Sequence, residues 1–305
     1  MRHAFLPFLL LVSLFARPAQ AAPYYYFGHF TTREGLPSNT IHCTYQDHFG
    51  FVWIGTRDGL TRFDGYDFRS PDPTEGGNDI TSLATVDIAE DEDGLIWFST
   101  SEGLGSYNPY TGKTERLGQL GTGNSYDLQP DGKGSIWFTG DKIYRYIKAT
   151  GEVKAYPAGS SYPRKIAVDT NENVWAISVG GKLYNYNKRS DAFEETGLSL
   201  RLTNIEPAEN GNLLASTTDQ VLLIGTANLN LTVTEVFSTK SRGLEVREIL
   251  ERKPGEYWIG SSHGLFVQNL NTGELIEMHP QEADPHSLSA ANNGMVKINL
   301  FFIFF

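Results

Sequence analysis

The side chains that offer the most chemistry in this sequence are polar residues that recur at one place in a repeating pattern. Charged and amide groups gathered on one face could hydrogen-bond sugar hydroxyls, while nearby aromatic rings stack on the sugar faces. The same residue types also suit tight turns for conformational reasons alone, and at any single position that explanation carries the larger share. The candidate ligand-binding residues are Arg57, Asp58, Glu102, Asp141, Lys142, Asp219, Gln220 and His263.

Motifs of catalysis and metal binding are not evident in the sequence. None of the seven histidines has the His-x-x-x-His or Glu-x-x-His spacing of a metal site. The glycine-rich run 55–60 is typical of a strand, a turn and a strand, not of a phosphate-binding loop. The single cysteine, Cys43, fits a small buried hydrophobe better than a reactive thiol. We therefore expect no enzyme activity in this chain itself, no cofactor and no metal.

The elements that must position the candidate residues are indicated by an internal repeat. An apolar strand, a turn such as Asp47 to Gly50 and a strand carrying a tryptophan return with a period of roughly 40 residues. Four short strands per unit at this period predict an all-β fold, a β-propeller of four-stranded blades. The candidate residues then fall on the turns between the second and third strands, which with the inter-blade loops form the face where propellers bind ligands.

Six blades are recognisable, and a seventh appears only as a beginning. The fourth, fifth and sixth copies depart from the turn pattern with Glu172, Ala208 and Arg252. Residues 287–305 end where the next Asp-x-x-Gly turn and tryptophan belong, so we expect an incomplete ring, from a fragment of a longer protein or a shifted reading frame. The predicted blades lie near residues 41–68, 85–117, 125–156, 165–194, 203–237 and 246–278, with the truncated seventh at 287–305.

The recurring tryptophans are predicted to be structural residues that wedge neighbouring blades together. A buried tryptophan removes about 150–250 Å² from water, a gross gain of roughly 4–6 kcal/mol. The fifth copy has leucine in place of tryptophan, so we expect its blade to be held least tightly. The predicted wedge residues are Trp53, Trp97, Trp137, Trp175, Leu214 and Trp258.

The N-terminal residues predict export. Residues 1–21 have a short polar start, an apolar stretch too short to span a bilayer, and an Ala-x-Ala ending typical of a signal peptide cleaved after Ala21. The remainder, 22–305, is then one periplasmic propeller domain without a membrane span. The aromatic run from Tyr24 to Phe30 is expected to close the ring as a strand paired with the last blade. A net charge of -11 argues against nucleic acid or an anionic membrane surface as partner.

The run from Gly35 to Phe68, GLPSNTIHCTYQDHFGFVWIGTRDGLTRFDGYDF, strongly resembles the two-component regulator propeller repeat. Later copies such as EDEDGLIWFSTSEGLGSYNPYTG and PGEYWIGSSHGLFVQNLNTGE are similar to the same repeat. That family forms the periplasmic sensor region of hybrid two-component sensor histidine kinases. The resemblance implies the sensing half of such a protein, with the kinase and a homodimer contact lying in a downstream region.

The function that this resemblance implies is the binding of an extracytoplasmic signal, a small molecule or an oligosaccharide, and its transmission to a kinase absent from this chain. Three alternatives stay open. The first is an enzyme on the same scaffold, a quinoprotein-like dehydrogenase or a lyase. The second is the sensor region of a diguanylate cyclase, and the third is a structural interaction module at the cell envelope.

Overall fold

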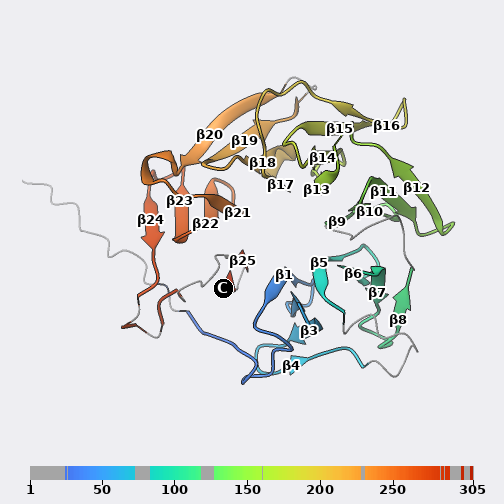
Figure 1. The fold of residues 1–305 in the computed structure, drawn as a ribbon, viewed down its shortest axis with the longest axis horizontal. Coiled ribbons are helices and arrows are strands. Elements are labelled where there is room, and N and C mark those ends of the chain that lie inside the picture. The colour runs from blue at the N-terminus through green and yellow to red at the C-terminus, as the bar shows by residue number, and fades with distance from the viewer. Residues whose placement is uncertain are drawn as a thin grey trace, which may run out of the picture.

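The computed structural model describes residue 25, residues 27–72, 83–117, 127–159, 161–227, 231–281, 283–284 and 286–288, and the backbone of 297–298 and 303–304. The predicted signal peptide, 1–21, lies outside these residues. The described chain forms six four-stranded antiparallel sheets in a ring (Figure 1), which confirms the predicted β-propeller. Two short 3₁₀ segments, Glu209–Gly211 and Lys240–Arg242, lie among the strands. Within this part of the chain, no helix is long and apolar enough to cross a membrane.

The strands of the first three blades follow one another outward from the axis in chain order. Blade 1 consists of β1 (Ile41–Gln46), β2 (Val52–Thr56), β3 (Gly59–Phe63) and β4 (Phe68–Arg69). Blade 2 consists of β5 (Thr85–Glu90), β6 (Ile96–Thr100), β7 (Gly103–Tyr107) and β8 (Thr114–Arg116). Blade 3 consists of β9 (Leu128–Pro130), β10 (Ser135–Thr139), β11 (Ile143–Ile147) and β12 (Glu152–Tyr156).

The other three blades repeat the same order. Blade 4 consists of β13 (Pro163–Val168), β14 (Val174–Ser178), β15 (Leu183–Asn187) and β16 (Ala192–Glu195). Blade 5 consists of β17 (Asn204–Pro207), β18 (Leu213–Ser216), β19 (Gln220–Gly225) and β20 (Thr232–Ser238). Blade 6 consists of β21 (Val246–Lys253), β22 (Glu256–Ser261), β23 (Gly264–Asn269) and β24 (Leu275–Met278).

The turn between the first two strands of a blade is closed by an aspartate that also binds the tryptophan. In blade 1, Asp47 Oδ1 accepts the N–H groups of Phe49 and Phe51, and Asp47 Oδ2 accepts the indole N–H of Trp53 at 2.8 Å. The indole donates to the same oxygen in blades 2, 3 and 4, at 2.8, 3.4 and 2.9 Å. One carboxylate thus fixes both the turn and the orientation of the indole ring.

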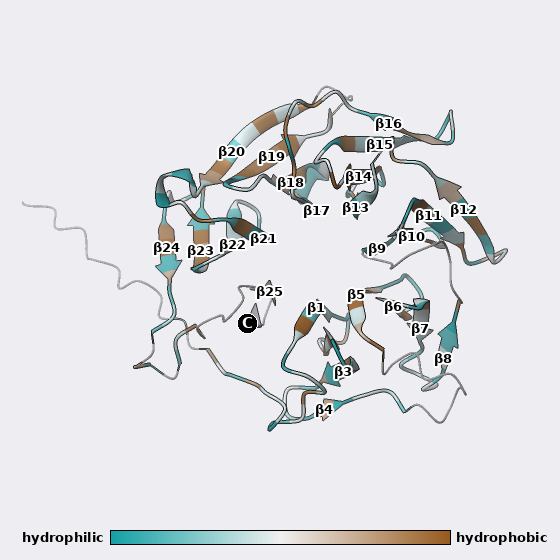
Figure 2. Cartoon of the chain, in the orientation of Figure 1, coloured by the Kyte–Doolittle hydropathy of each residue, from teal (hydrophilic) through white to brown (hydrophobic). Residues whose placement is uncertain are grey.

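The tryptophans of blades 1 to 4 each pack against the next blade. Trp53 and Leu60 of blade 1 lie in one apolar cluster with Ile88, Ile96 and Phe98 of blade 2. Equivalent clusters join blades 2 to 3, 3 to 4, 4 to 5 and 5 to 6. Hydrophobic residues accordingly occur in the strands of every blade, whereas the outer strand β8 is hydrophilic (Figure 2). The hydrophobic core of this protein therefore lies between its sheets.

Blades 5 and 6 lack the aspartate, and each compensates differently. In blade 5, Ala208 and Leu214 replace both partners, so no indole N–H is left without an acceptor; Leu214 is fully buried against blade 6. In blade 6, Trp258 Nε1 donates to Glu256 Oε1 at 3.0 Å, and Arg252 lies over the indole ring at 5.3 Å. The aspartate and the tryptophan are thus lost together in blade 5, whereas blade 6 keeps the tryptophan and binds it with other side chains.

The segment before the first blade touches both blade 6 and blade 1. Tyr25 packs edge-on against Trp258 with ring centroids 5.5 Å apart, and Phe30 packs on Phe63 at 5.0 Å. The N–H of Phe27 donates to the carbonyl of His286 at 3.1 Å. The described residues of this segment are not a strand, so they join the two blades mainly by aromatic contacts and not by the predicted strand pairing.

A short strand pair occupies part of the space between blades 6 and 1. β25 (Lys297–Ile298) pairs with β26 (Ile303–Phe304), and β25 lies against β1 and β21, the innermost strands of those blades (Figure 1). Because the structure shows two strands here and not four, a seventh blade beginning at residue 287 stays a prediction.

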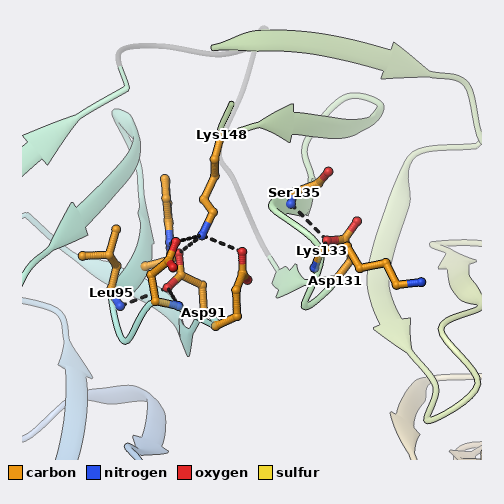
Figure 3. A network of polar contacts seen from close by, with 9 residues as sticks. Asp91, Leu95, Asp131, Lys133, Ser135 and Lys148 are labelled. Carbon is orange, nitrogen blue, oxygen red and sulfur yellow. Dashed lines mark hydrogen bonds and ion pairs between the residues drawn. The ribbon is translucent and has the colours of Figure 1, made fainter. Parts of the chain in front are cut away.

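A lysine of blade 3 ties that blade to the acidic turn of blade 2 (Figure 3). Lys148 Nζ lies 2.7 Å from a carboxylate oxygen of each of Asp91, Glu92 and Asp93. Burial alone would raise the pKa of Asp91, yet hydrogen bonds from Lys148 and from the Trp97 indole outweigh it and hold this pKa below its usual value. Asp91 thus stays ionised beneath the inter-blade contact.

Removing the tryptophan wedge should cost more than removing its leucine substitute. We expect Trp97→Ala to lower the free energy of unfolding by roughly 3–5 kcal/mol, because it opens a cavity and removes the indole donor of Asp91. Leu214→Ala should cost about 2–3 kcal/mol because it removes fewer atoms. Urea titrations compare the two variants, and equal losses would contradict the equivalence of these positions.

Lys148→Met should destabilise the protein by about 2–4 kcal/mol, because it leaves the buried Asp91 carboxylate without its cation. The depressed pKa of Asp91 contributes stability above the unfolded-state pKa of about 4, and that stability is lost as the pH falls through the folded-state value. The variant should therefore lose less stability than the wild type on acidification below about pH 4.

Lys133→Met is the matched control, since Lys133 belongs to the same blade and pairs with Glu172 at a site where both side chains are about half exposed. A surface pair of this kind contributes about 0–1 kcal/mol. Similar losses for the two lysine variants in urea titrations would show that the contact of Lys148 is no stronger than a surface ion pair.

Candidate functional site

The innermost strands bring one residue of each blade to the axis of the ring. In every blade but the third, this residue pairs across the first two strands with a residue that lies two positions after the tryptophan or Leu214. Asp87 pairs with Ser99 in this way, and Glu248 with Gly260. In blade 3, Asp127 precedes Trp137 by the same number of residues as Asp87 precedes Trp97. We call this set the axial ring: Cys43, Asp87, Asp127, Lys165, Asn204 and Glu248.

In four blades, an irregularity in strand pairing directly precedes the residue that belongs to the axial ring. The register between the first two strands shifts immediately before Cys43, Asp87, Lys165 and Glu248. An extra residue at such a place bends the strand and changes the direction of the side chain that follows. Local backbone irregularity and the repeat together determine which side chains face the axis.

The axial ring, except for Asn204, forms part of the wall of a cavity of about 360 Å³. Cavities of this size hold small-molecule ligands in other proteins. Each of the six innermost strands contributes to the wall, and in blade 3 Asp127, which directly precedes β9, contributes as well. The lining residues are 43–46 of β1, Asp87 and Ile88 of β5, Asp127 and Gln129 at β9, Lys165 of β13, Glu206 of β17 and 248–250 of β21.

One lysine and four carboxylates determine the electrostatics of the cavity. Lys165 Nζ lies 2.9 Å from Glu206 Oε1 and 3.4 Å from Asp127 Oδ1. Burial raises the pKa of Asp127 to about 7, although Lys165 opposes the rise. Burial also raises the pKa of Glu206. Burial by itself would lower the pKa of Lys165, but Asp127 and Glu206 together with Glu248 and Asp87 hold it well above its usual value.

The same side chains join each blade to the next. Asp87 Oδ2 accepts the N–H of Leu128 at 2.8 Å, and Asp127 Oδ2 accepts the N–H of Ile166 at 2.7 Å. In each case a carboxylate of one blade binds the backbone of the following blade. A change in the charge or position of these carboxylates would therefore act directly on the contacts between blades.

A polar side chain at the cavity has donors and an acceptor available for hydrogen bonds. The side-chain amide of Gln129, which lines the cavity, has no hydrogen-bond partner in the part of the chain that the structure describes. Cys43, which is buried and in no disulfide, belongs to the same wall. Across the described ranges, no three His, Cys, Asp or Glu side chains are placed to hold a metal ion.

The candidate residues predicted from the sequence lie elsewhere. Arg57 and Asp58 lie in the β2–β3 turn, Glu102 in the β6–β7 turn, Asp141 and Lys142 between β10 and β11, Asp219 and Gln220 at the β18–β19 turn, and His263 in the β22–β23 turn. These turns share one end of the blades, and none of the eight residues lines the axial cavity.

Several of these candidates bind neighbours within their own blades. Glu102 pairs with Arg116 at 2.9 Å, and Asp141 accepts the hydroxyl of Tyr144 at 2.5 Å. Gln220 donates to Glu235, and His263 Nδ1 lies 3.0 Å from Ser262 Oγ. These four side chains are therefore each bonded to a residue of their own blade. The axial ring could have been found in the sequence by comparing the residues at equal distance before each tryptophan.

Comparison with known proteins agrees with the geometry. The fold defines the class of protein, a β-propeller. Residues 35–58, which span β1 and β2, match the family model described as two component regulator propeller, so the chain carries that repeat in its first blade. The chain is also 44% identical over 43 residues to a protein named histidine kinase P4 from Formosa agariphila; the match covers 14% of this chain and 3% of that protein.

Solved structures share the fold over most of the chain. The extracellular domain of BT4673 from B. thetaiotaomicron, assigned to the hybrid two component systems, has a TM-score of 0.74 at 15% identity and covers 90% of this chain. The corresponding domain of BT3049 has a TM-score of 0.71 at 18% identity. This chain spans 36% and 39% of those two chains. Virginiamycin B lyase from Staphylococcus aureus has a TM-score of 0.65 at 16% identity, with 80% of this chain and 85% of the lyase covered.

Asp127→Asn should change how stability depends on pH. A folded-state pKa of about 7 lies above the unfolded value of about 4, so Asp127 favours folding at low pH, and this contribution is lost as the pH rises through 7. The asparagine keeps an oxygen for the N–H of Ile166 but does not titrate. We expect the difference in unfolding free energy between pH 5 and pH 8 to shrink in the variant. Parallel pH profiles would contradict the raised pKa.

Proposed function

We propose that this chain is the extracytoplasmic ligand-sensing propeller of a two-component signal transduction system. Its ligand is an oligosaccharide or a similar polar small molecule, which it binds in the axial cavity. The signal passes to a kinase. The observation that carries the proposal is a polar cavity whose walls come from every blade.

The repeat in blade 1 and the likeness to extracellular domains of hybrid two component systems support the sensor assignment. The predicted signal peptide supports a location outside the cytoplasm. Hydrogen-bonding groups such as the free amide of Gln129 suit a hydroxyl-rich ligand, since sugar hydroxyls both donate and accept.

The position of the cavity also supports a route for the signal. Asp87 and Asp127 line the cavity and at the same time bind the backbone of the next blade. A ligand that bonds to these carboxylates competes with, or strengthens, contacts between blades. Binding energy would thereby bias how neighbouring blades are held, which is the kind of differential contact that a conformational signal requires.

Thermal unfolding and calorimetry of the full chain with a panel of oligosaccharides test the proposal. A ligand at 100 times its Kd should stabilise the protein by about 2.7 kcal/mol. Gln129→Leu should weaken binding if the ligand lies in the axial cavity. Arg57→Ala with His263→Ala should weaken it instead if the outer turns form the site. A panel in which nothing binds would overturn the sensor proposal.

The second candidate is an enzyme on this scaffold, favoured by the likeness to virginiamycin B lyase, most of whose length aligns with this chain. The residues that line the axial cavity supply carboxylates and a lysine but no histidine. Mass spectrometry of each bound ligand after prolonged incubation separates the two candidates. An unchanged ligand supports the sensor, and turnover that Asp127→Asn abolishes supports the enzyme.

A further inference from the structure

Two exposed aromatic side chains from neighbouring blades meet at the end of the ring where the β1–β2 turn lies. Phe49, in that turn, is 54% exposed, and Tyr110, in the β7–β8 turn of blade 2, is 64% exposed. Their ring centroids lie 5.8 Å apart with the planes at 73°, and the His48 ring packs on Phe49 at 3.8 Å. We call these three side chains the aromatic corner. Contiguous exposed apolar surface of this kind is typical of a binding site.

The backbone and a buried carboxylate hold two of the three side chains in place. The N–H of Phe49 donates to Asp47 Oδ1 at 3.0 Å, within the turn that the aspartate closes. The carboxylate of Glu90, which is only 8% exposed, accepts the backbone N–H of His48 at 2.8 Å and also accepts from the His48 ring at Nδ1. A surface already held in its bound shape loses little conformational entropy when a ligand binds, so the aromatic corner is preorganised.

Polar atoms lie beside the rings of the aromatic corner. The β5–β6 turn approaches both blades' rings at Gly94, where a Cβ atom would lie 3.3 Å from Tyr110 Oη and 3.4 Å from His48 Cε1. Tyr110 Oη has no hydrogen-bond partner among the described residues, and Nε2 of His48 is available because the contact with Glu90 uses Nδ1. The corner therefore combines aromatic surface with a hydroxyl and an imidazole nitrogen that can bond a ligand.

The aromatic corner adjoins the axial cavity through the β1–β2 turn. Gln46, the last residue of β1, lines the cavity, and its amide donates to the carbonyl of Gly50 at 3.0 Å, in the turn that carries Phe49. Phe49 follows Gln46 by three residues, a span of at most about 10 Å. The cavity, at about 360 Å³, is at the small end of the range for ligand sites. Part of an oligosaccharide longer than the cavity therefore lies outside it, within reach of Phe49.

We propose that the aromatic corner is a second sugar-binding subsite, on which an outer unit of the oligosaccharide stacks while inner units lie in the axial cavity. This inference rests on the proposed function and narrows the ligand to an oligosaccharide longer than the cavity. A face of a pyranose ring presents C–H groups that pack on an aromatic ring, and its hydroxyls bond to Tyr110 and His48. The subsite lies at the opposite end of the blades from the turns between second and third strands.

The size of the aromatic corner favours a sugar over a protein partner. Two aromatic side chains bury at most about 500 Å². A stable protein interface buries roughly 800 Å² on each partner. A single sugar unit is therefore the better fit to this surface.

A series of chain lengths tests the proposal. Titration calorimetry of the full chain uses the di-, tetra- and hexasaccharides of cellulose, xylan and laminarin. For the sugar that binds, affinity should rise at least about fivefold from the disaccharide to the hexasaccharide, a difference of about 1 kcal/mol. Phe49→Ala should remove that gain and leave the disaccharide unchanged. Tyr110→Phe keeps the ring but removes the hydroxyl, and should weaken the hexasaccharide about two- to threefold.

Tyr66→Ala is the matched control. Tyr66 lies in the β3–β4 turn at the same end of blade 1, is 91% exposed and packs on no other aromatic ring of the described residues, so its loss should change neither affinity. Gln129→Leu alters the cavity and should weaken the disaccharide and the hexasaccharide alike. Thermal unfolding of each variant without sugar confirms that it is folded.

Several results would overturn the inference and leave the sensor proposal standing. These are an affinity that does not depend on chain length, a hexasaccharide that Phe49→Ala and Tyr66→Ala weaken equally, and binding confined to compounds other than these sugars. Sedimentation that shows a dimer disrupted by Phe49→Ala would assign the corner to a second copy of the chain and also contradict the inference. If no compound of the wider panel binds, the sensor proposal fails with it.

Discussion

The interaction on which the rest of the structure depends is the pairing of a turn aspartate with the tryptophan indole. One oxygen of the carboxylate accepts backbone N–H groups and closes the first turn of a blade; the other accepts the indole N–H and fixes the ring in the plane of the inter-blade contact. A buried carboxylate and a buried indole N–H would each be costly alone, and together they satisfy one another. Where the aspartate is missing, the tryptophan is also absent, or other side chains bind it, as Glu256 and Arg252 do for Trp258.

The apolar faces of the blades pack against one another between the sheets. The polar edges of the innermost strands therefore face the axis. This explains how an otherwise ordinary all-β core comes to enclose four carboxylates and a lysine. The axial carboxylates also bind the backbone of the next blade, so the groups that could meet a ligand are the groups that hold neighbouring sheets together. A site on the axis therefore senses, and influences, every blade junction that its wall residues serve.

The region between blades 6 and 1 is organised differently from the other junctions. Among the described residues, Tyr25 and Leu288 pack with Trp258, and Phe30 packs with Phe63, where the other junctions have a whole neighbouring sheet. Few backbone bonds support these contacts, and β25 adds only a two-residue strand beside β1 and β21.

The sequence by itself determined the repeat, the blade count and the packing role of the tryptophans, because each depends on local patterns: alternation within a strand, Asp and Gly in a turn, and a period near 40 residues.

The sequence did not determine the axial cavity. Asp87, Lys165 and Glu248 are far apart in the chain and lie in strands whose pattern is also that of ordinary half-buried residues. Ring closure brings them together, and bulges that no residue type announces turn their side chains inward. The candidates at the turns between second and third strands were chosen by residue type, and none of them lines the axial cavity, whose wall comes from the innermost strands. What a side chain can do follows from its type, but which side chains meet is decided by the closure of the ring.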